Sequence, residues 1–389
     1  MAQRLVILGS TGSIGTSALD VVSHLRDEFE VVGLSAGRNV ELLAAQAAEF
    51  GVPSVAVADP QRRSELAAAV GGGCRVLAGP EGLIDLVRHG ECDFVLSAIV
   101  GAAGLPPTLE AVRLGKTIGL ANKETLVVAG SLILPLAQKT GAVVLPIDSE
   151  HSAVFQAIQA GRPDEVQRVW LTASGGPFRT YSAEQLAAVT LDEALRHPTW
   201  SMGPKITIDS ATMMNKALEV IEAWWLFGLE PEAIRVLVHP ESIVHSLVEF
   251  CDGSVIAQLG APDMRTPIQY ALTYPRRVES VAERLDLTRL GTLSFEEPDE
   301  RRFPALGLGY EVVRQGGSAG AVLNGANEAA VGAFRAGRIG FCQIAELTGE
   351  VLARHQVLEA PSLDELFEAD AWAREEVDRC LSRVGSQVP

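Results

Sequence analysis

Cysteine is scarce in this chain, and none of its five cysteines stands in a CxxC pair. An odd number without paired spacing argues against a disulfide framework or a zinc knuckle and favours a reducing compartment such as the cytoplasm. Long apolar runs are also missing. The longest, residues 126–137, is too short to cross a bilayer and contains Gly130 and Pro135. The sequence therefore predicts a cytoplasmic protein without a membrane partner.

An excess of positive charge is likewise absent. The chain has 32 Lys and Arg against 49 Asp and Glu, which gives a formal net charge of −17. Such a field repels nucleic acids and anionic membranes, so neither is expected as a partner. An anionic small substrate needs local cations or a metal ion to overcome this field. With 389 residues, 47% of them hydrophobic, the chain is long enough for two or three domains.

Short apolar runs alternate with helical patterns over the first 150 residues. This alternation predicts a doubly wound parallel α/β sheet of the Rossmann type. The expected strands are residues 4–8, 30–36, 54–58, 94–98, 117–120 and 142–145, and the clearest helices are residues 13–25 and 40–50.

The pattern changes to α+β after Pro146. Helices are expected at residues 152–160 and 210–227, with strands at 166–173, 236–238, 243–250 and 254–259. Four late helical patterns predict a C-terminal bundle: residues 305–315, 320–335, 341–355 and 362–384. The predicted segments are a cofactor domain (1–147), a catalytic and metal-binding α+β domain (148–273), a linker (274–299) and a helical domain (300–389).

Gly9, Gly12 and Gly15 follow a predicted strand and open a predicted helix. Glycines in this context allow a tight turn, and the helix N-terminus offers amide donors to a pyrophosphate. The spacing differs by one residue from the common GxGxxG pattern. The motif indicates a dinucleotide site, and an ordinary tight turn between strand and helix is the alternative.

The end of the second strand selects the form of the dinucleotide. NAD sites usually carry an acid there, which binds the ribose 2′-hydroxyl. This chain reads Gly37-Arg38-Asn39 instead. The cation favours the 2′-phosphate of NADPH, whereas a solvated loop arginine is the alternative.

Asp148 and Glu150 stand just after a predicted strand. In an extended chain, residues two apart point the same way, so the two carboxylates would converge. A hard divalent cation such as Mg²⁺ or Mn²⁺ would suit them, although two acids in a solvated turn are the more common explanation.

The helix that starts near Ser210 adds further polar groups. Asn215 and Glu219 share a face at a spacing of four residues, and Lys216 lies three residues before Glu219. We expect Asp209 or Ser210 to cap this helix. Ser210, Asn215 and Lys216 suit a phosphate, and Glu219 could complete a metal site. An amphipathic helix with an ordinary ion pair explains the pattern equally well.

Polar residues on three other turns are also candidates. Ser174 precedes two glycines, and His197 lies in a loop, residues 196–205, that could close over a substrate with Trp200 excluding water. Lys123, between Asn122 and Glu124, follows the strand 117–120, at the sheet edge where α/β proteins bind ligands.

Taken together, these segments resemble the 1-deoxy-D-xylulose 5-phosphate reductoisomerase family over essentially the whole chain. The motifs that carry the resemblance are residues 9–15, 120–124, 146–151, 174–178, 211–219 and Leu323-Asn324-Gly325-Ala326-Asn327-Glu328.

The resemblance implies a role for each motif residue. Those implied to bind NADPH are Thr11, Gly12, Ser13, Ile14, Gly37, Arg38, Asn39, Asn122, Glu124 and Gly203. Those implied to hold Mg²⁺, Mn²⁺ or Co²⁺ are Asp148, Glu150 and Glu219. Those implied to contact the substrate are Lys123, Ser149, Glu150, Ser174, His197, Ser210, Asn215, Lys216 and Glu219. Lys123, Asp148, Glu150 and Glu219 would be the catalytic residues.

The implied activity is a rearrangement of 1-deoxy-D-xylulose 5-phosphate followed by reduction with NADPH to 2-C-methyl-D-erythritol 4-phosphate, an isoprenoid precursor. The resemblance also implies a homodimer. Two other functions stay open from the residues: an NADPH-dependent homoserine or semialdehyde dehydrogenase, which needs no three-carboxylate metal site, and a dinucleotide sensor without catalysis.

Overall fold

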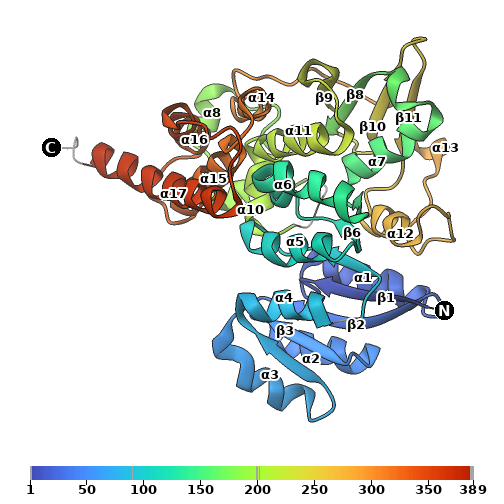
Figure 1. Cartoon of the computed structure of the whole chain (residues 1–389). Coiled ribbons are helices and arrows are strands. Elements are labelled where there is room, and N and C mark those ends of the chain that lie inside the picture. Colours follow the sequence, from blue (N-terminus) through green and yellow to red (C-terminus); the bar gives the residue numbers. More distant parts are fainter. Residues whose placement is uncertain (1, 90, 199, 201, 386–389) are drawn as a thin grey trace. The chain divides into compact units, whose positions relative to one another are not determined.

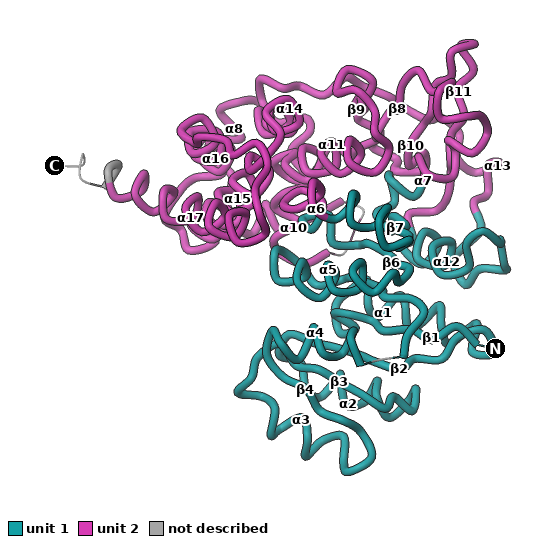
Figure 2. The backbone as a smooth tube through the Cα atoms, viewed as in Figure 1, with its two compact units in different colours: residues 1–125, 133–152, 263–284 teal, residues 126–132, 153–262, 285–389 magenta. Residues whose placement is uncertain are grey.

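The computed structural model describes residues 2–89, 91–198, 200 and 202–385, which form two compact units (Figures 1 and 2). Unit 1 comprises residues 1–125, 133–152 and 263–284, and unit 2 comprises residues 126–132, 153–262 and 285–389. Residues 199 and 201 of the loop predicted to close over a substrate lie outside the described residues. The division is coarser than the four predicted segments, which stay a prediction.

Unit 1 is built on a seven-stranded sheet in the order β4-β3-β2-β1-β5-β6-β7. All neighbouring strands are parallel, which confirms the predicted doubly wound α/β class. The strands are buried at their centre because apolar residues such as Val6, Ile7, Val95 and Leu96 fill both faces. Their bounds are β1 Gln3–Leu8, β2 Phe29–Ala36, β3 Ser54–Val57, β4 Arg75–Ala78, β5 Phe94–Ser97, β6 Thr117–Leu120 and β7 Val143–Pro146.

Helices connect these strands and cover the sheet (Figure 1). Right-handed crossovers place the helices that follow β1 to β3 opposite those that follow β4 and β5, because the chain runs outward from β1 on its two sides. A late helix, α12 Arg265–Thr273, packs on α1 and contacts β6 and β7. The others are α1 Ser13–His24, α2 Val40–Phe50, α3 Arg63–Val70, α4 Gly79–His89, α5 Leu105–Arg113 and α6 Glu124–Thr140.

Parallel strands bring their carboxyl ends to one edge of the sheet. In unit 1, this edge carries the turns that follow Leu8, Ala36, Leu120 and Pro146. The order in which successive strands are added to the sheet reverses between β1 and β5, and ligands of α/β sheets bind at such a point. The topology therefore gathers the glycine turn and the predicted residues 37–39, 122–124 and 148–150 along one edge.

Unit 2 contains a four-stranded mixed sheet in the order β11-β10-β8-β9. β10 is antiparallel to β8 and β11, and β8 is parallel to β9. Asp252 and Gly253 lie between β10 and β11, which pair as an antiparallel hairpin. The strands are β8 Val166–Ala173, β9 Ile234–Val238, β10 Val244–Phe250 and β11 Val255–Leu259.

The predicted C-terminal helices are confirmed as a packed group in which α15 contacts α14, α16 and α17 (Figure 1). Their bounds are α14 Ala305–Gln315, α15 Ala319–Arg335, α16 Gln343–Arg354 and α17 Leu363–Gly385. The remaining helices are α7 Ser149–Ala157, α8 Ala183–Ala187, α9 Leu191–Ala194, α10 Pro204–Ala211, α11 Met214–Phe227 and α13 Leu287–Leu290.

The continuous helix predicted from Ser210 to Phe227 is wrong at its start. Two helices, α10 and α11, meet at Met213, whose φ of 64° breaks the helical path. The predicted caps are wrong for the same reason, because Asp209 and Ser210 lie inside α10. The hydroxyl of Thr212 instead accepts the N–H of Met214 at 3.3 Å, at the beginning of α11.

A second correction concerns residues 148–150. Asp148 directly precedes α7, and Ser149 is its first residue, so these residues do not form an extended segment. The two carboxylates are brought together by the first turn of a helix rather than by strand alternation.

Among the described residues, no helix combines the length and the hydropathy that a bilayer crossing needs.

Two glycines of α15 allow a matched test of how closely this helix packs against α6. A Cβ on Gly320 would stand 2.0 Å from the carbonyl oxygen of Val127, whereas a Cβ on Gly332 would meet nothing within 4 Å. We expect Gly320→Ala to lower the free energy of unfolding by about 1–3 kcal/mol or more. Gly332→Ala should raise it by roughly 0.5–1 kcal/mol because alanine favours helix. Urea unfolding measures both, and equal signs would contradict the packing.

Candidate functional site

The glycine turn of unit 1 joins β1 to α1 at the carboxyl edge of the sheet. Gly9 has a φ of 85°, and a Cβ there would lie 2.7 Å from the carbonyl oxygen of Ala98, so only glycine fits. Gly12 is the N-cap of α1, and no side chain caps its first amides. Thr11, Ser13 and the backbone of Gly12 are accessible to solvent. The arrangement suits an anionic group at the helix N-terminus.

A buried hydrogen-bond network that the sequence did not reveal holds this turn. The hydroxyl of Ser10 donates to Gln46 Oε1 at 2.8 Å, and Gln46 Nε2 donates to the carbonyl of Ser10 at 3.0 Å. Ser35 Oγ accepts the N–H of Gly9 at 3.0 Å. Gln46 comes from α2 and Ser35 from β2, so the turn is fixed from two neighbouring elements.

Gly37, Arg38 and Asn39 are exposed where β2 ends. The Arg38 guanidinium lies 3.1 Å from Asp59, and 81% of its side chain is exposed. An exposed pair of this kind contributes little, so Arg38 can turn to an incoming phosphate at small cost. Asn39 accepts the N–H of Leu42 at 3.2 Å and so caps α2.

Asn122 and Lys123 are buried where β6 ends, and Glu124, also buried, begins α6. The amide of Asn122 donates to the carbonyl of Gly101 at 2.9 Å and accepts the N–H of Thr125 at 2.9 Å, so its side chain braces this edge. Lys123 forms an ion pair with Asp148, at the end of the neighbouring strand β7.

Asp148 and Glu150 converge at the start of α7. One oxygen of each carboxylate lies within 4.8 Å of the other. Ser149 Oγ donates to Glu150 at 2.6 Å. The N-terminal end of α7 and the ammonium of Lys123 place positive charge beside these acids. This all-oxygen donor set suits a hard divalent cation.

Ser174, His197 and Ser210 form a cluster in unit 2. His197 Nε2 lies 3.2 Å from Ser174 Oγ and 3.1 Å from Ser210 Oγ. Gly176, with a φ of 67°, lets the turn after β8 approach α10, because a Cβ there would stand 2.8 Å from the carbonyl oxygen of Ser210. Three predicted residues far apart in sequence are therefore brought together.

His197 is in contact with the loop that contains Trp200. The backbone N–H of Trp200 donates to His197 Nδ1 at 2.9 Å, so the neutral ring carries its proton on Nε2. Burial lowers the pKa of His197, which favours this neutral form. One Nε2 proton serves two hydroxyl oxygens, so the hydroxyl protons of Ser174 and Ser210 can point to an anion.

Glu219 of α11 is fully buried and receives two donors from its own helix. Asn215 Nδ2 donates to one carboxylate oxygen and Lys216 Nζ to the other. The ammonium of Lys216 also donates to the carbonyl of Thr172 at the end of β8. The predicted shared face is confirmed, and the pair is buried, unlike an ordinary surface ion pair.

The structure thus places every predicted site residue within one of two sets, and Gly203 is the exposed N-cap of α10. Unit 1 holds Thr11, Gly12, Ser13, Ile14, Gly37, Arg38, Asn39, Asn122, Lys123, Glu124, Asp148, Ser149 and Glu150, and unit 2 holds Ser174, His197, Gly203, Ser210, Asn215, Lys216 and Glu219.

Comparison with known proteins points to one family. Three family models match: 1-deoxy-D-xylulose 5-phosphate reductoisomerase at residues 5–130, its C-terminal domain at residues 144–227, and the DXP reductoisomerase C-terminal domain at residues 259–376. The reductoisomerase of Pelodictyon phaeoclathratiforme is 54% identical over 96% of this chain and 98% of its own length. That of Symbiobacterium thermophilum is 53% identical over 96% and 98%.

Solved structures agree with the sequence matches. The reductoisomerase of Zymomonas mobilis in complex with NADPH has a TM-score of 0.92 and 44% identity, covering 98% of this chain and 99% of that one. A DOX-P reductoisomerase in complex with NADPH, fosmidomycin and magnesium has a TM-score of 0.91 and 42% identity, with 98% and 99% covered.

The exposed position of Arg38 predicts a selective effect on the cofactor. Arg38→Ala should raise the Michaelis constant for NADPH about tenfold, since an exposed charge-assisted contact to phosphate is worth roughly 1.4 kcal/mol. The constant for NADH, which has no 2′-phosphate, should change little. Arg62→Ala, which removes another exposed arginine of unit 1 that is paired with Glu65, is the control. An equal rise of the Michaelis constants for NADPH and NADH would show that Arg38 does not bind the 2′-phosphate.

Proposed function

Because this chain belongs to the 1-deoxy-D-xylulose 5-phosphate reductoisomerase family, we propose that it converts 1-deoxy-D-xylulose 5-phosphate to 2-C-methyl-D-erythritol 4-phosphate, with NADPH and a divalent cation. The match along the whole chain carries this proposal. It sets aside the homoserine or semialdehyde dehydrogenase and the non-catalytic sensor, which the residues alone left open.

The glycine turn and its neighbours on the sheet edge are the proposed NADPH site. The first amides of α1, at Gly12 to Ile14, suit the pyrophosphate, and Arg38 suits the 2′-phosphate. Gly37, Asn39, Asn122, Glu124 and Gly203 would line the remainder. NADPH supplies the hydride when bound. The network of Ser10, Ser35 and Gln46 keeps the turn in the geometry that this binding needs.

Asp148, Glu150 and Glu219 are the proposed ligands of Mg²⁺, Mn²⁺ or Co²⁺. The fit rests on the donor set: three carboxylates suit these cations, and each has a cation or a hydroxyl as a second partner that orients it. A bound divalent cation polarises the carbonyl of a substrate and stabilises its oxyanion character. Lys123 fixes Asp148, and Ser149 fixes Glu150.

The cluster of unit 2 is the proposed phosphate site. Ser174 and Ser210 offer hydroxyl protons, His197 offers its Nε2 proton, and Asn215 and Lys216 lie on the first turn of the next helix. The substrate phosphate is remote from the bonds that change, so its binding energy can hold the reacting part in place. Trp200, whose N–H is bound to His197, would help exclude water when its loop closes.

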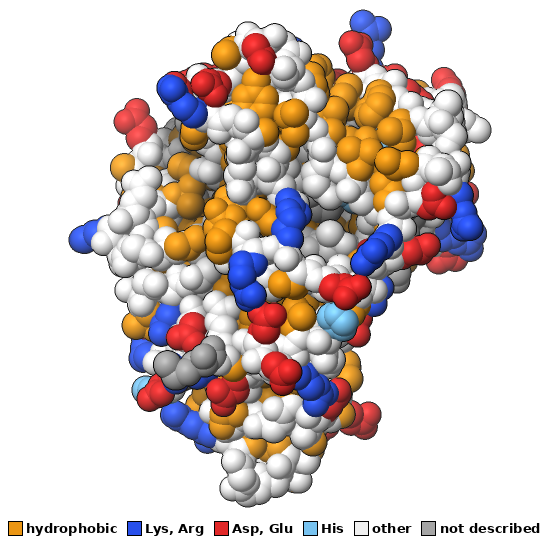
Figure 3. All heavy atoms as spheres, turned by 90° about the vertical axis from the view of Figure 1, so that its right-hand side faces the viewer, with side chains coloured by type: hydrophobic (Ala, Val, Ile, Leu, Met, Phe, Trp, Pro, Cys, Tyr) orange, Lys and Arg blue, Asp and Glu red, His pale blue; other side chains and the backbone are white. Residues whose placement is uncertain are grey.

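A homodimer in the cytoplasm is part of the proposal. β11 is an edge strand, and within the described part of the chain it pairs only with β10. Val255 and Ile256 on it are 49% and 39% exposed. Figure 3 views the molecule from the side on which β11 lies in Figure 1, and hydrophobic side chains gather on the upper part of this face. Such an edge favours pairing with a second copy. Sedimentation equilibrium should then give twice 41.3 kDa.

One assay tests the proposed function. The purified protein should consume NADPH, followed at the nicotinamide absorbance, only when 1-deoxy-D-xylulose 5-phosphate is present. Chelation with EDTA should abolish the consumption, and added Mn²⁺ should restore it. Homoserine and aspartate semialdehyde serve as control substrates. Consumption with a control substrate, or activity that survives chelation, would overturn the proposal.

Glu219 allows a separate test of the metal site. Glu219→Gln keeps the shape of the side chain but removes the negative charge, so turnover should fall by about 10³-fold or more, as for the loss of a metal ligand in a catalytic site. NADPH binding, measured by fluorescence titration, should stay unchanged. Glu232→Gln, an exposed glutamate before β9, is the control. A weakened NADPH affinity in Glu219→Gln would argue against a metal role.

A further inference from the structure

The motif Leu323 to Glu328 lies in α15, outside the residues assigned to cofactor, metal or substrate. Its polar side chains tie α15 to two other helices. Asn327 Nδ2 donates to Asp209 of α10 at 3.0 Å, and Asn324 Nδ2 donates to Asp370 of α17 at 2.9 Å. Between them, Gly325 lets α17 approach, because a Cβ there would stand 2.4 Å from the carbonyl oxygen of Asp370. The motif is therefore a junction of three helices.

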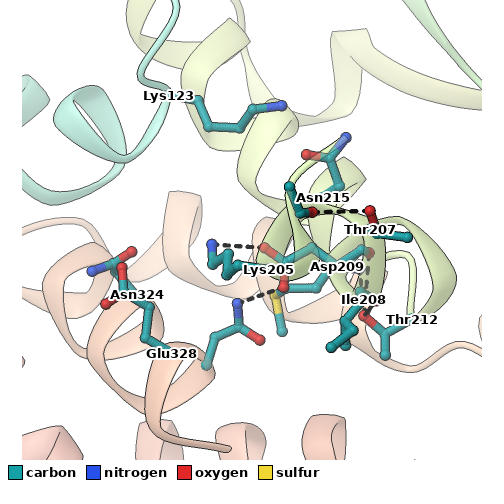
Figure 4. A network of polar contacts seen from close by, with 12 residues as sticks. Lys123, Lys205, Thr207, Ile208, Asp209, Thr212, Asn215, Asn324 and Glu328 are labelled. Carbon is teal, nitrogen blue, oxygen red and sulfur yellow. Dashed lines mark hydrogen bonds and ion pairs between the residues drawn. The ribbon is translucent and has the colours of Figure 1, made fainter. Parts of the chain in front are cut away.

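Asp209 is the residue of α10 that the junction contacts, and it directly precedes Ser210 of the proposed phosphate site (Figure 4). Its side chain is 1% exposed, and both carboxylate oxygens have donors: Asn327 at 3.0 Å and Lys205 Nζ at 2.6 Å. A buried carboxylate without partners costs several kcal/mol, so the two contacts hold Asp209 in one position. Lys205 belongs to α10 as well, so among the described residues the side-chain contact to Asp209 from outside that helix is Asn327.

The position of Asp209 determines that of Ser210. α10 has eight residues, too few to be stable without tertiary contacts. Ser210 follows Asp209 directly, faces His197 at 3.1 Å and has its carbonyl against Gly176. Just beyond α10, Met213 turns the chain into α11, whose first residues include Asn215 and Lys216. A shift at Asp209 would therefore displace Ser210 and the beginning of α11.

We propose that Asn327 is a positioning residue for the phosphate of the substrate and acts through Asp209. This inference rests on the proposed function, because it assigns the cluster of Ser174, His197 and Ser210 to that phosphate. Asn327 itself is fully buried and touches no group of the cluster in the described contacts. Its hydrogen bond fixes α10, and α10 fixes the hydroxyl of Ser210.

The substitution Asn327→Asp tests this role because it keeps the size of the side chain. It places a second carboxyl about 3 Å from Asp209, and two such groups cannot both ionise without strong repulsion. A proton shared between them restores the hydrogen bond at low pH, and its loss breaks the bond at high pH. The other charged groups at this junction are Lys205 from α10, Glu328 from α15, and Asp370 and Arg374 from α17.

We expect Asn327→Asp to raise the Michaelis constant for 1-deoxy-D-xylulose 5-phosphate about tenfold or more at pH 8, relative to wild type at the same pH, because the lost contact concerns binding. The ratio of the variant's Michaelis constant to that of wild type should fall towards one at pH 6. The turnover number should change less than threefold, and the dissociation constant of NADPH should not change. A merely structural defect would not give a pH-dependent ratio confined to substrate binding.

Two further variants complete the experiment. The double variant Asp209→Asn with Asn327→Asp exchanges donor and acceptor and keeps a single carboxylate in the pair, so it should restore the Michaelis constant to within threefold of wild type. Asn324→Asp, one turn earlier in α15, faces Asp370 rather than Asp209. It is the matched control, and it should lower stability without raising the Michaelis constant.

An unchanged Michaelis constant in Asn327→Asp at pH 8 would overturn the inference, as would an equal rise in Asn324→Asp or no rescue in a folded double variant. If Asn327→Asp does not fold, Asn327→Ser is measured instead, since the shorter hydroxyl cannot span the distance to Asp209. It should show the same rise at both pH values, and no rise would again overturn the role. Absence of turnover in wild type would refute the proposed function. The dissociation constant of inorganic phosphate then replaces the Michaelis constant, and an equal affinity in wild type and Asn327→Asp at pH 8 would overturn the positioning role.

Discussion

Lysine–carboxylate pairs with at least one buried partner are the constraint on which the polar residues of both units depend. In unit 1, Lys123 pairs with Asp148, and in unit 2, Lys216 pairs with Glu219 and Lys205 with Asp209. A buried ion that loses its partner is strongly destabilising, so each pair fixes two side chains and the elements that carry them. Two of the pairs each lie within a single helix: Lys216 and Glu219 are three residues apart in α11, and Lys205 and Asp209 are four residues apart in α10. Only the first joins two strand ends.

The sequence predicted the sheet of unit 1 well because its strands are apolar runs bounded by turn residues. The missed strand, β4 Arg75–Ala78, is a partly exposed edge strand that follows three glycines, so it carries neither a buried run nor a clear alternation. The break between α10 and α11 was also missed. It depends on a left-handed methionine, Met213, and no residue preference announces that conformation.

In the candidate site, features set by local helix geometry could be predicted, whereas contacts between distant parts of the chain could not. The spacing of Asn215, Lys216 and Glu219 determined their shared face because helix geometry is local. Gln46, Ser35 and Asn327 could not be found in this way, since each acts on a residue from another element of the chain. The convergence of Ser174, His197 and Ser210 likewise depends on the packing of a turn, a loop and a helix.

The proposed phosphate cluster carries little net positive charge of its own, although the chain has a net charge of −17. The ammonium of Lys216 is already matched by Glu219, and burial lowers the pKa of His197, which favours its neutral form. The cluster therefore presents hydroxyl and ring N–H donors rather than a large positive charge. Such donors stabilise an anion only when they are held in place, because hydrogen bonds depend on direction far more than a net charge does. The rigidity of α10 is for this reason a condition of binding, and the buried carboxylate of Asp209 is what supplies it.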